Sequence, residues 1–183
     1  MTNYRRVELA RRAGRVSRYH GQYLARPENI AEHTFGVMNI LVIMTGGQLS
    51  ANLLITALYH DGGEYISGDM FSPIKKLVPG LRETCNALEK EGTDETVGPL
   101  PELTAWEYKL LKVADNLDGL IKCTEEYRMG NYTIGETYHE YEDGVGGQYA
   151  LYLRGQRSEL GGGPIGDLID KAIDQWESVR HDH

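Results

Sequence analysis

No apolar run in the 183-residue chain approaches the roughly 18 residues that a membrane-spanning helix requires. The opening residues MTNYRRVELARR also lack the apolar segment of a secretory signal peptide. There are only two cysteines, Cys85 and Cys123, which lie far apart and form no CxxC pair, so a disulfide framework is excluded. We therefore expect a cytoplasmic protein that uses no membrane and buries both thiols in its core.

Alternating apolar and polar residues, the pattern of a half-buried strand, are also missing. The chain has no internal repeat or low-complexity segment, and its 40% hydrophobic and 25% charged residues are typical of a globular domain. Apolar residues recur at helical spacing along most of the sequence instead. We expect an all-α fold that forms a single domain over residues 1–183.

Capping residues and glycines set the expected ends of the helices. Ser50 and Thr104 are of the type that caps a helix N-terminus, and Gly130 is placed to stop the helix that Thr104 begins. The expected helices cover residues 3–17, 29–44, 51–65, 80–91, 104–129, 136–154 and 164–180. The acidic stretch EGTDETVGPLPEL (91–103) predicts the longest loop, and SPIKKLVPG (72–80) predicts a short helical turn between prolines.

Positive charge is scarce outside the N-terminal region. Residues 1–30 carry a net charge of +5, from seven arginines against Glu8 and Glu28, whereas the whole chain carries −8. A basic segment of this kind can attract phosphate groups, but most of these arginines fit a solvated helix face that pairs with the acidic remainder. The acidity of the whole chain argues against a nucleic-acid polymer as partner.

The stretch TALYHDGGEYISGD (56–69) places charged and flexible residues at the end of an otherwise apolar helix. On a continuous helix, Glu64 would lie one turn beyond His60 and Asp61, which suits a metal with a carboxylate beside it. The two glycines between them would each cost a helix interior about 1 kcal/mol relative to alanine. They indicate that something large approaches the backbone, a substrate being one candidate. Taken alone, the His-Asp dipeptide is better explained as a hydrogen-bonded helix end.

Two further polar residues stand in apolar helical surroundings. His33 lies within ENIAEHT, and Asp115 lies within LLKVADNLDGL, where an unpaired buried carboxylate would be very unfavourable. Each has an ordinary explanation by itself, His33 as a core or capping histidine and Asp115 as a partner of Lys112. Together with His60 and Asp61, they supply two imidazoles and two carboxylates from three helices. Such a set suits a divalent transition metal with positions left for water and substrate.

Four blocks of the sequence occur together in one order. They are Arg18, ENIAEHT, YHDGGEYISGDMFSPIKK and ADNLDGLIKCTEEY. With this order and spacing, over residues 15–128, the chain resembles the HD-domain phosphohydrolases and, within them, the bacterial 5′-deoxynucleotidases. The resemblance implies a helical HD-domain bundle with a metal site between its helices, a deoxynucleotide substrate and a homodimer.

The resemblance also gives each conspicuous residue a role. The metal would be bound by His33, His60, Asp61 and Asp115, and would be Co²⁺, Mn²⁺ or a similar transition metal, with Mg²⁺ as a further candidate. Glu64 would assist the attacking water, and Arg18 would orient the phosphate. The substrate would be contacted by Arg18, Tyr19, Asp61, Asp69, Ser72 and Lys75.

Some of these roles stay open on the residues alone. Asp69 follows a glycine, and its carboxylate either caps the next turn or accepts a hydrogen bond from a sugar hydroxyl. Lys75 and Lys76 follow Pro73, and they either reach a phosphate as point charges or form a solvated pair.

The sequence departs from the family pattern in two places. Tyr19 and His20 stand where the family usually has Trp and Pro, and Met70 and Phe71 stand where it usually has Leu and Pro. These departures bear on the selectivity for base and sugar rather than on the metal chemistry.

The favoured reaction converts a deoxynucleoside 5′-monophosphate to the deoxynucleoside and phosphate. The main alternative resembles the small phage dATP triphosphohydrolases, in which Lys75 and Lys76 would neutralise the outer phosphates. A second alternative is a non-catalytic HD module that binds metal and nucleotide. Glu64 argues against that module, because a sensor has less need of a carboxylate beside the metal ligands.

Overall fold

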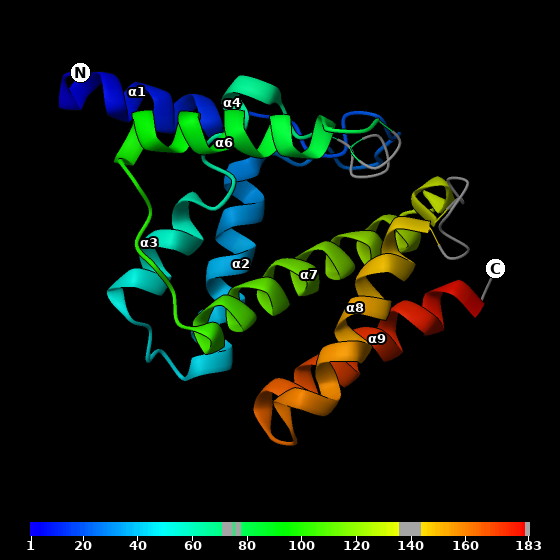
Figure 1. Ribbon diagram of the computed structural model, residues 1–183. Coiled ribbons are helices and arrows are strands. Elements are labelled where there is room, and N and C mark those ends of the chain that lie inside the picture. The colour runs from blue at the N-terminus through cyan, green and yellow to red at the C-terminus, as the bar shows by residue number, and fades with distance from the viewer. Residues whose placement is uncertain (71–74, 76–77, 136–143, 182–183) are drawn as a thin grey trace.

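The chain folds into helices joined by short connections (Figure 1). The computed structural model describes residues 1–70, 75, 78–135 and 144–181. Its elements are α1 (Asn3–Ala13), α2 (Ile30–Thr45), α3 (Ala51–Tyr59), α4 (Glu64–Ser67), α6 (Leu81–Val97), α7 (Ala105–Arg128), the 3₁₀ helix η1 (Tyr132–Gly135), α8 (Gly144–Leu160) and α9 (Pro164–His181). No strand occurs within these ranges, and the backbone makes one isolated bridge, between Ser17 and Asn29. The prediction of an all-α fold is confirmed.

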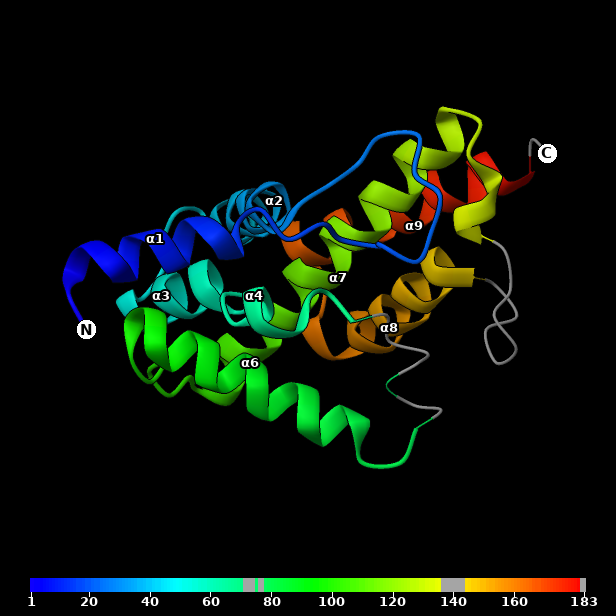
Figure 2. The same cartoon turned by 90° about the horizontal axis from the view of Figure 1, so that it is seen from above.

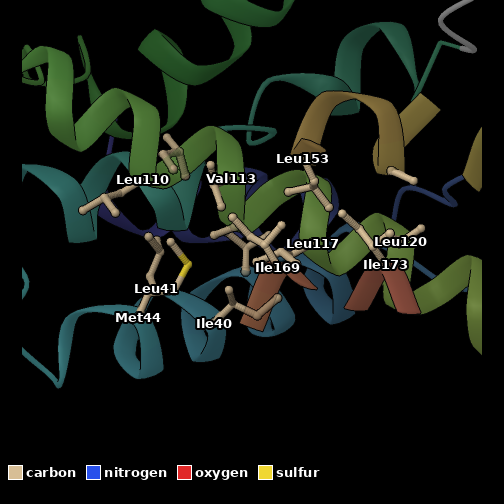
Figure 3. Packing of buried hydrophobic residues seen from close by; sticks show 14 of the residues in the cluster. Ile40, Leu41, Met44, Leu110, Val113, Leu117, Leu120, Leu153, Ile169 and Ile173 are labelled. Atoms are coloured by element: carbon tan, nitrogen blue, oxygen red, sulfur yellow. The ribbon is translucent and has the colours of Figure 1, made fainter. Parts of the chain in front are cut away.

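Helix α7 is the centre of the molecule. It packs against α2 on one side and against α8 and α9 on the other (Figure 1). Figure 3 shows side chains from all four helices meeting in one apolar core. The core includes Ile40, Leu41, Met44, Leu110, Val113, Leu117, Leu120, Leu153, Ile169 and Ile173. Full burial of each such side chain contributes about 1.5–3 kcal/mol, so this core fixes α7 against α2, the two long helices that carry site residues.

A second group of helices, α1, α3, α4 and α6, lies towards the opposite end of the molecule from α8 and α9 (Figures 1 and 2). Helix α6 packs against α1 and α4, and α3 packs against α2 (Figure 2). The contact between α4 and α6 is made by backbone: a β-carbon on Gly63 would lie 2.6 Å from Glu89 Cα, and one on Gly92 would lie 2.8 Å from Gly63 O. Gly63 is therefore required by a neighbouring helix, and the large group that approaches the backbone at this position is α6.

The predicted helix starts agree with the observed caps. Asn29, Ser50 and Thr104 each accept a hydrogen bond from a backbone N–H of the first turn, and Asn29 and Thr104 form complete capping boxes. Both cysteines are buried and free, as predicted. No helix in the described ranges is long and apolar enough to span a bilayer.

Four predicted helix ends are wrong, those of α1, α3, α6 and α8. Helix α1 ends at Ala13, because the chain then runs as a bridge beside the start of α2. The third helix ends at Tyr59 and not near residue 65, since a turn separates it from α4. Helix α6 continues to Val97 through part of the predicted loop.

The extension of α6 has a tertiary cause. Gly92 fits against the turn before α4, and the hydroxyls of Thr93 and Thr96 donate to backbone carbonyls of the preceding helical turn. Helix α8 likewise continues to Leu160, beyond its predicted end, and the predicted segment at 136–143 lies outside the described residues.

Candidate metal centre and active site

His33 lies at the middle of the candidate site. It projects from α2, and its side chain is fully buried. Its Nε2 lies 3.3 Å from His60 Nε2, 3.3 Å from Asp115 Oδ1 and 3.5 Å from Asp61 Oδ2. All four of the predicted ligands are thus brought together from α2, α7 and the turn after α3.

The chemistry of this donor set fits a divalent metal. Ligand atoms of His33, His60 and Asp115 lie within 4.8 Å of one another, and Asp61 Oδ2 is 3.4 Å from His60 Nε2. Each imidazole is oriented by a partner of its Nδ1 atom. His60 Nδ1 lies 2.7 Å from the Ala57 carbonyl oxygen, and His33 Nδ1 lies 2.6 Å from Asp118 Oδ2. Orientation of metal-binding histidines by such partners is usual.

Protonation shows how strongly these groups interact. Burial lowers the pKa of His33, but hydrogen bonds with Asp115 and Asp118 outweigh burial and raise the pKa to about 9. Burial raises the pKa of Asp115, but the hydrogen bond with His33 and the charge of Lys112 dominate and hold it well below its ordinary value. Without a metal, the His33 ring at the centre of the site is therefore protonated and positively charged at neutral pH.

Glu64 begins α4 and differs from the other carboxylates. Its side chain is buried, and its Oε2 makes no hydrogen bond with any residue in the described part of the chain. Burial, together with the charges of Asp61 and Asp69, raises its pKa to about 9. A buried oxygen without a hydrogen-bond partner is unfavourable for folding, which indicates that Glu64 is at this position for a functional reason.

Arg18 lies close to Asp118, and its guanidinium group has three neighbours that restrict its orientation. Its Nη1 is 2.6 Å from Glu28 Oε2 and 4.0 Å from Asp118 Oδ2. Its guanidinium carbon lies 4.8 Å from the centre of the Tyr19 ring. The planar group is therefore fixed in orientation, which suits recognition of phosphate oxygens.

Tyr19 has an unusual backbone conformation. Its φ angle is 54°, in the left-handed region that residues other than glycine rarely adopt. The Tyr19 N–H donates to Asp69 Oδ2 at 2.9 Å, and the Tyr19 hydroxyl lies 3.1 Å from the hydroxyl of Tyr149 on α8. Asp69 thus holds the Tyr19 backbone, an arrangement that neither sequence-based explanation of Asp69 included.

A buried carboxylate anchors the segment between α1 and α2. Glu126 on α7 accepts hydrogen bonds from the N–H groups of Ala25 and Arg26 and from the side chains of Lys122 and Asn131. Lys122 also donates to the Arg26 carbonyl. This network ties the segment that carries the arginine and tyrosine described above to the central helix.

The remaining predicted substrate contacts are only partly described. Lys75 is half-buried and pairs with Glu89 at 2.9 Å, on the same face of α6 that contacts the turn before α4. Ser72 and Lys76 lie outside the described residues. The substrate roles of Ser72, Asp69 and Lys75 therefore stay predictions.

Sequence reasoning missed three residues that the fold brings to the site: Glu28, Asp118 and Tyr149. For Asp118 a signal existed, because it follows Asp115 by three positions and so shares its helix face. Glu28 also had one, because it begins the ENIAEHT block and lies ten residues after Arg18. Tyr149 carried no local signal, since its contact with Tyr19 joins distant parts of the chain.

Comparisons with known proteins identify the family of the chain. The family model described as 5′-deoxynucleotidase YfbR-like matches residues 7–147. The proteins named 5′-deoxynucleotidase YfbR from Salmonella paratyphi B and Salmonella newport are each 30% identical over 132 residues, covering 60% of this chain. The match spans 66% of the length of these curated relatives.

Two solved structures share the fold. The PH0347 protein from Pyrococcus horikoshii OT3 superposes with a TM-score of 0.66 at 18% identity, over 94% of this chain and 99% of its own. A conserved hypothetical protein from Pyrococcus furiosus gives a TM-score of 0.58 at 22% identity, over 86% and 98%. At such identities the two structures support the helical fold alone.

Proposed function

The chain belongs to the YfbR-like 5′-deoxynucleotidase family, and on that premise we propose that it is a metal-dependent phosphohydrolase that cleaves deoxynucleoside 5′-monophosphates. One observation carries the proposal. Two imidazoles and two carboxylates from α2, α7 and the turn after α3 converge, with His60, Asp61 and Asp115 each 3.3–3.5 Å from His33 Nε2. The buried Glu64 and Arg18 both lie close enough to interact with the charge of Asp61. Residues 1–183 would act as one catalytic domain.

A divalent ion, with Co²⁺, Mn²⁺ and Mg²⁺ as candidates, would be held by His33, His60, Asp61 and Asp115. When bound, such an ion supplies positive charge to phosphoryl oxygens and lowers the pKa of water from about 15.7 towards 7. The His33 side chain is the most buried of the four, which supports a fixed position for such a site.

Glu64 and Arg18 would perform the other two tasks of the reaction. A carboxyl whose pKa is raised is a stronger base once ionised, so it can take a proton from the attacking water and return one to the leaving oxygen. The guanidinium of Arg18 presents a fork of N–H donors that can hold two phosphate oxygens and so orient the ester. Tyr19, stacked against Arg18, would contact the nucleoside.

The charges of the site favour a monophosphate over a triphosphate. Arg18 would be occupied by the phosphate at the metal, and Lys75 pairs with Glu89 at 2.9 Å, so among the described residues neither is a spare cation for outer phosphates. A triphosphohydrolase would need further positive charge close to the site. The preference for 2′-deoxyribose has a different basis, the family to which the chain belongs.

The test is product analysis with dAMP, AMP and dATP, using protein stripped of metal and then reloaded with Mn²⁺ or Co²⁺. We expect free phosphate from dAMP, slower release from AMP, no release after chelation, and no release by an Asp115→Ala variant. Intact triphosphate from dATP with dAMP untouched would establish the triphosphohydrolase instead. Binding of dAMP and metal without any product would establish a non-catalytic module.

We further propose a cytoplasmic homodimer. The family resemblance supports the dimer, and exposed apolar side chains on α2 and α3 offer a surface for it, among them Phe35, Ile43 and Leu58.

A further inference from the structure

The carboxylate of Asp118 contacts His33, a proposed metal ligand, on the side of the ring that faces away from the other proposed ligands. His33 Nδ1 lies 2.6 Å from Asp118 Oδ2, while His33 Nε2 faces Asp61 and Asp115. The His33 side chain is fully buried and that of Asp118 is 15% exposed. The His33 ring thus lies between Asp118, which contacts Nδ1, and Asp61 and Asp115, which face Nε2.

This arrangement decides which nitrogen of His33 can bind a metal. An imidazole ligates through the nitrogen that carries no proton, and the proton must then reside on the other nitrogen. Asp118 is placed to accept that proton's hydrogen bond, which leaves the Nε2 lone pair directed at the ligand cluster. His60 obtains the same orientation from the Ala57 carbonyl, a backbone group that no substitution at that position removes.

Helix α2 makes room for Asp118 by means of a glycine. A β-carbon on Gly36 would lie 2.7 Å from Asp118 Cγ and closer still to its Oδ1. On α2, Gly36 follows His33 by three positions and so shares its helix face. On α7, Asp118 follows Asp115 by three positions in the same way. Glycine inside a helix costs about 1 kcal/mol relative to alanine, and Gly36 is retained where only glycine leaves space for the carboxylate.

A simple ion pair with Arg18 explains Asp118 less well. Their closest atoms are 4.0 Å apart, and Arg18 already pairs with Glu28 at 2.6 Å. The short contact of Asp118 is the one with His33, so its main action is on the metal ligand.

We propose that Asp118, in the space left by Gly36, is a positioning residue that fixes the tautomer and ring orientation of His33 for metal binding. The inference rests on the metal site of the proposed function. It goes beyond that function because it concerns how tightly the metal is bound, and it makes that affinity depend on Asp118 and Gly36.

The test measures metal affinity directly. Mn²⁺ would be titrated calorimetrically into metal-free wild-type protein and into Asp118→Asn, Asp118→Ala and Gly36→Ala variants. We expect Asp118→Ala to weaken binding by about 10- to 100-fold, the usual effect of removing such a partner. Asp118→Asn should lose less, because its amide oxygen still accepts the hydrogen bond, and Gly36→Ala should weaken binding by displacing Asp118.

Matched controls separate this role from folding. Asp174→Asn removes an exposed carboxylate on α9, and Gly155→Ala fills a helical glycine of α8 with open space around it, so both should bind Mn²⁺ normally. In the Zn²⁺-loaded wild type, NMR should show a slowly exchanging Nδ1 proton on His33. Asp118→Ala should lose that slow exchange while its helical circular dichroism is unchanged.

Equal Mn²⁺ affinity in wild type and all three variants, or wild-type protein that binds no metal, would overturn the proposal. Wild-type protein that binds Mn²⁺ with the expected dependence on Asp118 but releases no phosphate from dAMP would instead refute the proposed function and leave this inference standing.

Discussion

At the residue scale, the site combines carboxyl groups with opposite protonation behaviour. Asp115 is kept ionised by its hydrogen bond with His33, whereas Glu64 is kept protonated by burial and by neighbouring negative charge. Such a separation of the pKa values of two carboxyl groups fits the roles proposed for them, Asp115 as metal ligand and Glu64 as proton carrier.

Removing the proton-carrying ability of Glu64 should stop the chemistry and spare binding. In a Glu64→Gln variant we expect turnover of dAMP to fall by about two or more orders of magnitude, with Mn²⁺ affinity little changed. Steady-state kinetics and calorimetry on the same preparations provide the measurement, with Glu83→Gln, an exposed residue of α6, as control. Normal turnover by Glu64→Gln would make Glu64 a structural residue.

Glu64 should also make the metal-free protein less stable at high pH. Its pKa is about 9 in the folded protein against an ordinary value of 4.5, so the folded state holds a proton that the unfolded state releases first. The free energy of unfolding should therefore decrease as pH rises from about 4.5 towards 9. His33 contributes in the same direction from 6.5 to about 9, so wild type and variant must be compared.

The comparison is a melting curve in a chelating buffer at pH 5 and pH 8.5. Glu64→Gln should melt a few degrees above wild type at pH 8.5 and close to it at pH 5, since a neutral amide has no proton to lose. A constant difference at the two pH values would contradict the raised pKa.

At the scale of elements, the position of α4 depends on a backbone contact with α6. Gly63 immediately precedes Glu64, and Gly92 lies opposite it, so the two segments approach without side chains between them. The same helix α6 supplies Glu89, which pairs with Lys75. The orientation of the proposed proton carrier is thus set by a helix that contributes no predicted metal ligand.

A Gly63→Ala substitution tests this contact. Its β-carbon would meet backbone atoms of Glu89, which cannot move aside as a flexible side chain can, so we expect a loss of about 2 kcal/mol or more in the free energy of unfolding. Turnover should fall as well, because α4 must shift. Chemical denaturation and kinetics provide the measurement, and Gly155→Ala, which meets nothing, should be neutral or slightly stabilising. An unchanged denaturation midpoint would refute the contact.

At the scale of the whole molecule, the predicted ligands come from both sides of one interface. Helices α2 and α7 carry His33 and Asp115, and α3 leads into His60 and Asp61. The apolar core between α2 and α7 fixes the separation of the first two ligands (Figure 3). Stability of the core and geometry of the site are therefore linked.

The apolar side chains left exposed on α2 and α3 predict self-association. Sedimentation at micromolar concentration should give twice the chain mass of 20.5 kDa. A Phe35→Asp substitution should yield monomers, since this side chain is 72% exposed and a charge there would be desolvated in a dimer. A substitution at the exposed Leu151 on α8 is the control. Wild-type protein that sediments as a monomer would contradict the prediction.

The sequence by itself determined the helical class, the main caps and the four ligand candidates. Caps such as Ser50 and Thr104 are local, because a side chain and the backbone of the next turn suffice to form them. The ligands were predictable because polar residues such as His33 and Asp115 are too unfavourable in apolar helices without partners. The order of the motifs then predicted the family.

Tertiary structure alone decided what surrounds these residues. The extension of α6 through Gly92, the left-handed backbone of Tyr19 and the contact between Asp118 and His33 all depend on segments far apart in the chain. Local propensity cannot encode them, because each is stabilised by a neighbour whose position only the packed helices establish. The raised pKa of Glu64 has the same origin, since burial and nearby charge exist only in the folded protein.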